Sequence, residues 1–168
     1  HLLRFCELFS LKIYLLSFLL NIRKMKLKTI QVIMENDYQI PEGMKISELT
    51  PILMNALGLT HSDTREGALE ILWEWINRSY YSPDDLITMG NQLATNLHEG
   101  VGQLSSDSVF LRAFSALILG GIIRYDEQCA LGEVENRESF LTPSLLFQWF
   151  ELTQTFYLNE IDYRGYVQ

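Results

Sequence analysis

The clearest sign of the fold class is the stretch at residues 82–97, SPDDLITMGNQLATNL. Ser82 is a favoured N-cap residue, and Pro83 suits the first helical position because it has no N–H to leave unpaired. The two acids that follow favour the positive end of a helix dipole. Apolar side chains then recur every three or four residues, at Leu86, Met89, Leu93 and Leu97. This spacing predicts an amphipathic helix that begins at Ser82 and ends before Gly100.

The same spacing continues on both sides of this stretch. No segment shows the sustained alternation of a half-buried strand, so the chain is predicted to be all-α. The further helices are expected at residues 27–34, 46–57, 62–80, 105–123 and 142–164. Pro41 ends the first of them, Gly58 is the expected stop of the second, and Thr142-Pro143 repeats the Ser-Pro helix start.

The expected helix at residues 105–123 differs from the others because it is apolar nearly all round. This pattern is typical of a central, buried helix. Its Gly120-Gly121 pair predicts either close helix packing or a kink. The polar segment from Asp126 to Ser139 is then expected to be a mobile loop.

A faint internal repeat is present at an offset of 47 residues. It relates Arg65-x-x-Ala68-x-x-x-Leu72 to Arg112-x-x-Ser115-x-x-x-Leu119. Such an offset fits the helix pairs of HEAT-like proteins, in which stacked antiparallel pairs bury a continuous core. The expected architecture is therefore HEAT-like and α-solenoid-like, with an irregular helical bundle as the alternative.

Residues 1–24 differ in character from the rest of the chain. They are apolar and carry a net charge of +3, which leaves −11 for residues 25–168. The chain begins with His1, and Met25 is a plausible start, so residues 1–24 are interpreted either as sequence outside the native protein, as a packed helix, or as a basic helix at a membrane. Their cleanest apolar run, residues 13–20, is too short to span a bilayer. Residues 25–168 are expected to form one helical domain.

The composition argues against several function classes. A net charge of −8 offers no basic surface for nucleic acid. Cys6 and Cys129 lie far apart, which indicates a reducing cytoplasm and no disulfide framework. His98-Glu99 lacks the second histidine of a zincin helix, and there is no nucleophile elbow. No metal or cofactor is therefore predicted, and membrane contact is expected only through residues 1–24.

One cluster near the end of the chain is the best candidate site. It combines aromatic, acidic and basic side chains, at Tyr157, Glu160, Asp162, Arg164, Gly165 and Tyr166. On a helix, Glu160 and Arg164 share a face and Gly165 is placed to end it, so an ion pair with a helix cap is the simpler explanation.

Two stretches resemble a bacterial family of unknown function, the DUF2785 family. The segment SVFLRAFSAL at residues 108–117 is similar to one family motif, except that Ala113 stands where serine is expected. The segment YL-x-x-E-x-D-x-RGYV at residues 157–167 resembles a second and more specific motif. With Trp75-Ile76, the resemblance extends over about residues 26–168. The family pattern continues past this motif into a histidine segment, so the chain is interpreted as a C-terminal truncation.

Two functions follow as expectations. The first is a non-catalytic HEAT-like scaffold that binds a protein or peptide in the cytoplasm of a bacterium. The second is a hydrolase-like or metal-dependent enzyme whose site joins Glu160, Asp162 and Arg164 to the histidines that the resemblance implies.

Overall fold

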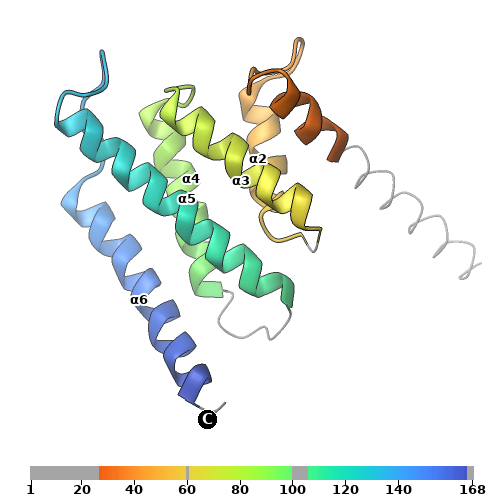
Figure 1. Cartoon of the computed structure of the whole chain (residues 1–168). Helices are drawn as coiled ribbons and strands as arrows, with labels where there is room; N and C mark the ends of the chain where they lie inside the picture. The colour runs from red at the N-terminus through yellow and green to blue at the C-terminus, as the bar shows by residue number, and fades with distance from the viewer. Residues whose placement is uncertain (1–26, 60, 100–105, 166–168) are drawn as a thin grey trace, which may run out of the picture.

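The chain folds into a stack of helices, and all regular secondary structure in the described residues is helical (Figure 1). The computed structural model describes residues 27–59, 61–99 and 106–165, and the side chains of 98–99, 106–109 and 155–165 lie outside that description. A first helix at residues 27–35 is followed by α2 (Ile46–Ala56), α3 (Ser62–Asn77), α4 (Pro83–Glu99), α5 (Ser106–Ala130) and α6 (Pro143–Gly165). The all-α prediction is confirmed.

The two predicted Ser/Thr-Pro helix starts have the expected capping bonds. The Ser82 hydroxyl oxygen accepts a hydrogen bond from the Asp85 N–H at 3.1 Å, at the start of α4. The Thr142 hydroxyl oxygen accepts one from the Leu145 N–H at 3.2 Å, at the start of α6. Each bond satisfies one of the N–H groups that a helix leaves unpaired in its first turn.

Two predicted helix ends are wrong. We expected the third helix to continue to Tyr80, but α3 ends at Asn77 and Ser79 has a φ of 60°, in the left-handed region. The loop predicted from Asp126 begins only after α5 ends at Ala130. Gly58 lies just beyond α2 as expected, but its φ is not positive, and a Cβ there would lie 3.0 Å from the Leu111 side chain. Gly58 therefore allows close packing and is not a left-handed cap.

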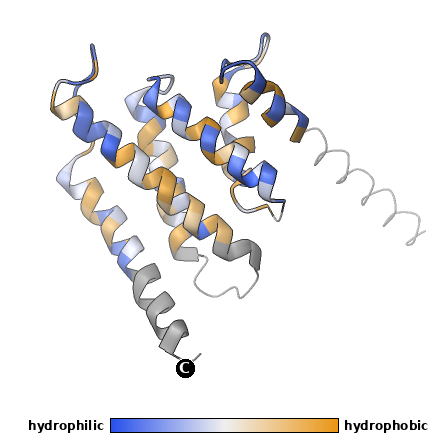
Figure 2. Ribbon diagram, in the orientation of Figure 1, coloured by the Kyte–Doolittle hydropathy of each residue, from blue (hydrophilic) through white to orange (hydrophobic). Residues whose placement is uncertain are grey.

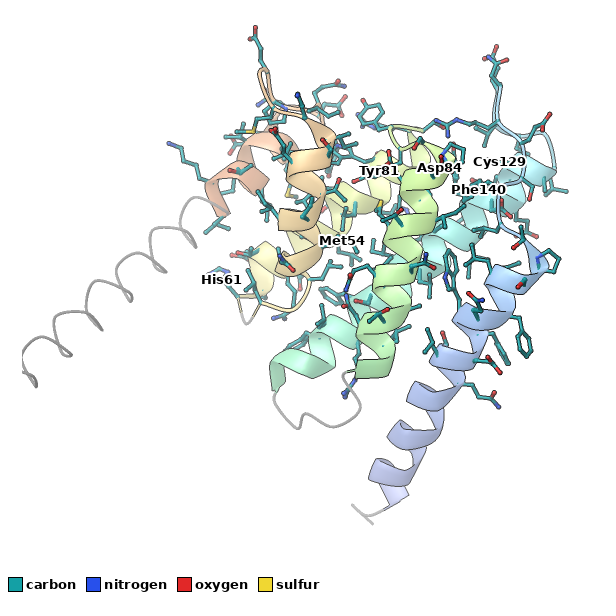
Figure 3. The ribbon with its side chains drawn as sticks, turned by 180° about the vertical axis from the view of Figure 1, so that it is seen from behind. Met54, His61, Tyr81, Asp84, Cys129 and Phe140 are labelled. Atoms are coloured by element: carbon teal, nitrogen blue, oxygen red, sulfur yellow. The ribbon has the colours of Figure 1, made fainter. Side chains whose placement is uncertain are left out.

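The helices alternate between two layers. Two pairs of consecutive helices pack together, α2 with α3 and α4 with α5. Two pairs of helices that are two apart in the chain also pack together, α3 with α5 and α4 with α6. Figure 1 shows α3 and α5 side by side in front of α2 and α4, and Figure 3 shows the opposite side. The first helix lies on α3, because Ile30 and Met34 both contact the position of Gly67.

The core lies between these layers. Its largest fully buried side chains include Trp75 of α3 and Tyr125 of α5, and buried aliphatic residues of the first helix and of α2 to α5 belong to the same core. Burying one large apolar side chain stabilises a fold by about 1.5–3 kcal/mol. The aliphatic members with less than 2% exposure include Ile33, Leu53, Ile71, Leu72, Leu86, Leu93 and Leu97.

Candidate interaction surface

The predicted cluster at the end of the chain is only partly described. The backbone of residues 157–165 is helical and belongs to α6. The side chains of Tyr157, Glu160, Asp162 and Arg164 lie outside the described residues, as do the side-chain environment of Gly165 and all of Tyr166. The cluster therefore stays a prediction.

Other groups that could carry chemistry are dispersed. Figure 3 shows His61 and Cys129 at opposite ends of the molecule. Burial raises the pKa of the Cys129 thiol, which disfavours the nucleophilic thiolate. Among the residues that the structure describes, no three His, Cys, Asp or Glu side chains are grouped so that they could hold a metal ion.

The polar connection between α5 and α6 is held in place by Asp126. This carboxylate is 8% exposed and accepts hydrogen bonds from the N–H groups of Phe140, at 2.6 Å, and Leu141, at 3.1 Å. The Ser139 hydroxyl also donates to it, and Arg137 donates to the Ser79 carbonyl at 3.2 Å. These bonds explain why Asp126, expected at the start of a solvated loop, lies buried on α5.

The spacing of Glu66, Glu70 and Glu74 at every fourth residue of α3 predicts a solvated acidic face, but this row is only partly solvated. Tyr38 donates a hydrogen bond to Glu70, and this bond is the main reason that the pKa of Tyr38 rises to about 12. Glu74 pairs with Arg78 at 3.2 Å, while Arg78 also donates to the Asp37 carbonyl at 2.7 Å. The row therefore helps to attach the segment before α2 to α3.

Large side chains pack onto glycines wherever two helices of one layer meet. A Cβ on Gly121 of α5 would lie 2.8 Å from the ring of Trp73 on α3, and a Cβ on Gly90 of α4 would overlap the ring of Trp149 on α6. The indole N–H of Trp149 also donates to the Asn91 side-chain oxygen at 2.9 Å. Together with the first helix on Gly67, the described residues contain three such contacts. The prediction of close packing at Gly120-Gly121 is thus confirmed at Gly121.

Gly120 has the opposite environment. No atom lies within 4 Å of a Cβ built on it. Leu117, one turn before it, is 52% exposed, and Ile123, one turn after it, is 38% exposed. We call Leu117, Gly120 and Ile123 the open flank of α5; Figure 2 shows hydrophobic residues along the middle of this helix. The prediction that this helix is buried all round is wrong on this flank, because no described helix covers it.

α6 exposes apolar side chains as well. Phe147 and Phe150 are each 61% exposed, although Trp149 beside them is 2% exposed. Of the eight exposed large apolar side chains in the described residues, five lie between Leu117 and Phe150. The last two helices carry four of these eight side chains, and Leu131 lies in the connection just after α5.

The internal repeat has a structural counterpart. Its positions on α3 and α5, two neighbouring helices of one layer, are all buried: Arg65, Ala68 and Leu72, and Arg112, Ser115 and Leu119. Arg65 donates to the Leu59 carbonyl at 2.8 Å, and its guanidinium lies 3.6 Å from the centre of the Phe110 ring. The two arginines thus pack inside the stack and add no positive charge to its surface.

Comparison with known proteins identifies the second half of this stack. Residues 97–168 match a family described as "Protein of unknown function (DUF2785)". This part of the chain belongs to that family. The DUF2785 region contains α5, its open flank and α6, whereas Trp75-Ile76 lies before the matched residues. No curated protein matches the chain, and neither does any solved structure.

None of the helices in the described part of the chain is both long and apolar enough to cross a membrane.

Proposed function

We propose that this chain is a bacterial, cytoplasmic, non-catalytic scaffold with HEAT-like helix pairs, and that it binds a protein partner. The partner surface consists of the open flank together with Phe147 and Phe150 of α6. The observation that carries this proposal is the exposure of Leu117 and Ile123 on α5, a helix that is apolar nearly all round up to residue 123.

The physical argument is the cost of leaving such a surface in water. Contiguous exposed apolar patches on soluble proteins commonly mark interaction sites. Four of the eight exposed large apolar side chains of the described residues lie on α5 and α6, whereas α4 turns Thr88, Asn91 and Gln92 to solvent. The alternation of helices in two layers, with buried repeat positions on α3 and α5, supports the HEAT-like interpretation.

The experiment is site-specific photo-crosslinking in the native host. The substitution Phe147→p-benzoylphenylalanine places the photoreactive group on the proposed surface, and Thr88→p-benzoylphenylalanine places it on the solvent face of α4 as the matched control. We expect a discrete crosslinked partner from position 147 and none from position 88. Equal crosslinking from both positions, or none from either, would contradict the proposal.

The enzyme alternative has its own test. Elemental analysis combined with native mass spectrometry of the complete gene product would show a stoichiometric metal if Glu160 and Asp162 help to bind one. Loss of that metal in Glu160→Ala, but not in Glu135→Ala, would favour the enzyme. A metal-free protein would favour the scaffold.

A further inference from the structure

We infer that α6 separates from α4 and docks again as one unit while the other helices of the stack stay folded, and that it pivots at Thr142. This inference goes beyond the proposed function, because it concerns two conformations of the chain itself and needs no partner. It starts from the small number of contacts that hold α6 in place.

α6 is docked on one helix. Among the described residues, α4 is the only helix against which α6 packs extensively, whereas α4 packs against both α5 and α6, and α3 against both α2 and α5. Of the described side chains of α6, only that of Trp149 is buried. Phe147 and Phe150 are mostly exposed and do little to hold the helix. Regions with few buried apolar contacts open at a lower free energy than the core of a protein.

The docking contact is concentrated at two adjacent residues of α4. The ring of Trp149 lies against Gly90, at the place that a Cβ on this glycine would occupy. The indole N–H of Trp149 donates to the side-chain oxygen of Asn91 at 2.9 Å. The packing of α3 on α5 and on α2 involves neither of these residues. Separation of α6 from α4 can therefore leave those helices in place.

The connection that precedes α6 is attached more firmly than α6 itself. Its last residues, Phe140 and Leu141, donate backbone hydrogen bonds to the buried carboxylate of Asp126 on α5. Leu141 is also buried, whereas Thr142, which follows it, is exposed. The connection is therefore expected to stay on α5 up to Leu141, which places the pivot at Thr142.

The opening affects the proposed partner surface. Leu117 and Ile123 belong to α5, whereas Phe147 and Phe150 belong to α6. The two parts of this surface are fixed relative to each other only while α6 is docked. This consequence rests on the proposed function, but the opening of α6 does not.

Native-state hydrogen exchange of the full chain, followed at single residues by NMR, tests the inference. Helices in proteins owe most of their stability to packing, so the amides of α6 are expected to exchange when it separates from α4. We expect the amides of residues 148–154 to share one opening reaction and to exchange at least about tenfold faster than those of Leu72 and Ile122 in the core. The amides of Phe140 and Leu141 are expected to exchange more slowly than those of α6.

Three variants test the docking contact. Gly90→Ala places a Cβ against the ring of Trp149, so it is expected to speed exchange in α6 by about tenfold or more and to leave Leu72 unchanged. Gly120→Ala is the matched control, because its Cβ meets no atom, and it should not speed exchange in α6. Asn91→Ala removes only the hydrogen bond from Trp149, and about two- to tenfold faster exchange in α6 is expected. This milder variant keeps the test decisive if Gly90→Ala does not fold.

Several results would overturn the inference. Exchange of the α6 and core amides at one common rate would show that α6 separates only when the whole chain unfolds. An equal rise in α6 and at Leu72 in Asn91→Ala would show the same. Exchange of Phe140 and Leu141 together with α6 would contradict the pivot at Thr142. None of these results changes the crosslinking expected from position 147, so failure of the inference and failure of the proposed function are distinguishable.

Discussion

Gly120 and Gly121 are adjacent residues of one helix, yet they lie on flanks with opposite environments. Trp73 packs onto Gly121, whereas nothing approaches Gly120. Both glycines have the same low intrinsic helix propensity, so the two positions differ only in the contacts that neighbouring helices make with them. On the covered flank the glycine lets two helices approach closely. On the open flank, no packing contact within the described residues offsets the low helix propensity of Gly120.

Trp149 and Phe150 are adjacent, but substituting them is expected to change the free energy of unfolding by very different amounts, the largest difference predicted between a covered and an exposed position. Trp149→Ala removes the ring that packs on Gly90 and is expected to lower the free energy of unfolding by about 3–5 kcal/mol. Phe150→Ala is expected to change it by less than about 0.5 kcal/mol, because Phe150 is mostly exposed. Urea denaturation of both variants measures the difference. Equal losses would show that α6 is not anchored through Trp149.

Asp126 tests whether the connection to α6 is anchored from α5. Asp126→Asn removes the charged acceptor of two backbone N–H groups and is expected to lower the free energy of unfolding by about 2 kcal/mol or more. Its exposed neighbour provides the control, since Glu127→Gln should change stability by less than about 0.5 kcal/mol. Chemical denaturation measures the free energy of unfolding of both variants. Similar losses in the two would contradict the claim that Asp126 anchors the connection to α6.

The adjacent glycines give a smaller effect with opposite signs. Gly121→Leu is expected to destabilise the protein by about 1–3 kcal/mol, because the new side chain meets the ring of Trp73. Gly120→Leu is expected to stabilise it by up to about 1 kcal/mol, through helix propensity alone. The two melting temperatures should therefore move in opposite directions from the wild type. A shift of both in the same direction would contradict the distinction between the flanks.

The smallest expected effect is spectroscopic and concerns the far end of the stack. The pKa of Tyr38 is raised from 10.0 to about 12, chiefly by its hydrogen bond to Glu70. Its contribution to stability is therefore complete below pH 10 and is lost as the pH rises through about 12. In an ultraviolet titration, Glu70→Gln should bring the pKa of Tyr38 back toward 10, with Tyr38→Phe identifying its transition. If the pKa of Tyr38 is unchanged in Glu70→Gln, the hydrogen bond between Tyr38 and Glu70 is not its cause.

Local sequence signals predicted the helices well. Ser82-Pro83 and Thr142-Pro143 specify helix starts through their own hydrogen bonds, so these starts follow without knowledge of the fold. The end of α5 could not be predicted in this way, because the polar residues Asp126 and Glu127 suggest a loop. Asp126 lies inside the helix because its carboxylate binds the backbone of the loop before α6. Gly67 and Gly90 were missed as packing sites, although a glycine within a helical pattern is itself a signal of close approach.

The surface could be predicted less well than the fold. An all-round apolar pattern indicated that α5 is buried, but the sequence does not say which neighbour covers each flank. The cluster at Glu160, Asp162 and Arg164 was selected from residue types alone, and the environment of its side chains lies outside the described residues. Membership of residues 97–168 in a family of unknown function assigns no role to that cluster.

Hydroxyl-radical footprinting of the full chain, both purified and inside cells of its native host, tests the central claim most directly. We predict that Leu117, Ile123 and Phe147 are oxidised in the purified protein and protected in the cell, while Trp75 is protected in both and Met44 is oxidised in both. Equal oxidation of Leu117 and Phe147 in the cell and in the purified protein would contradict the claim that the open flank is a binding surface.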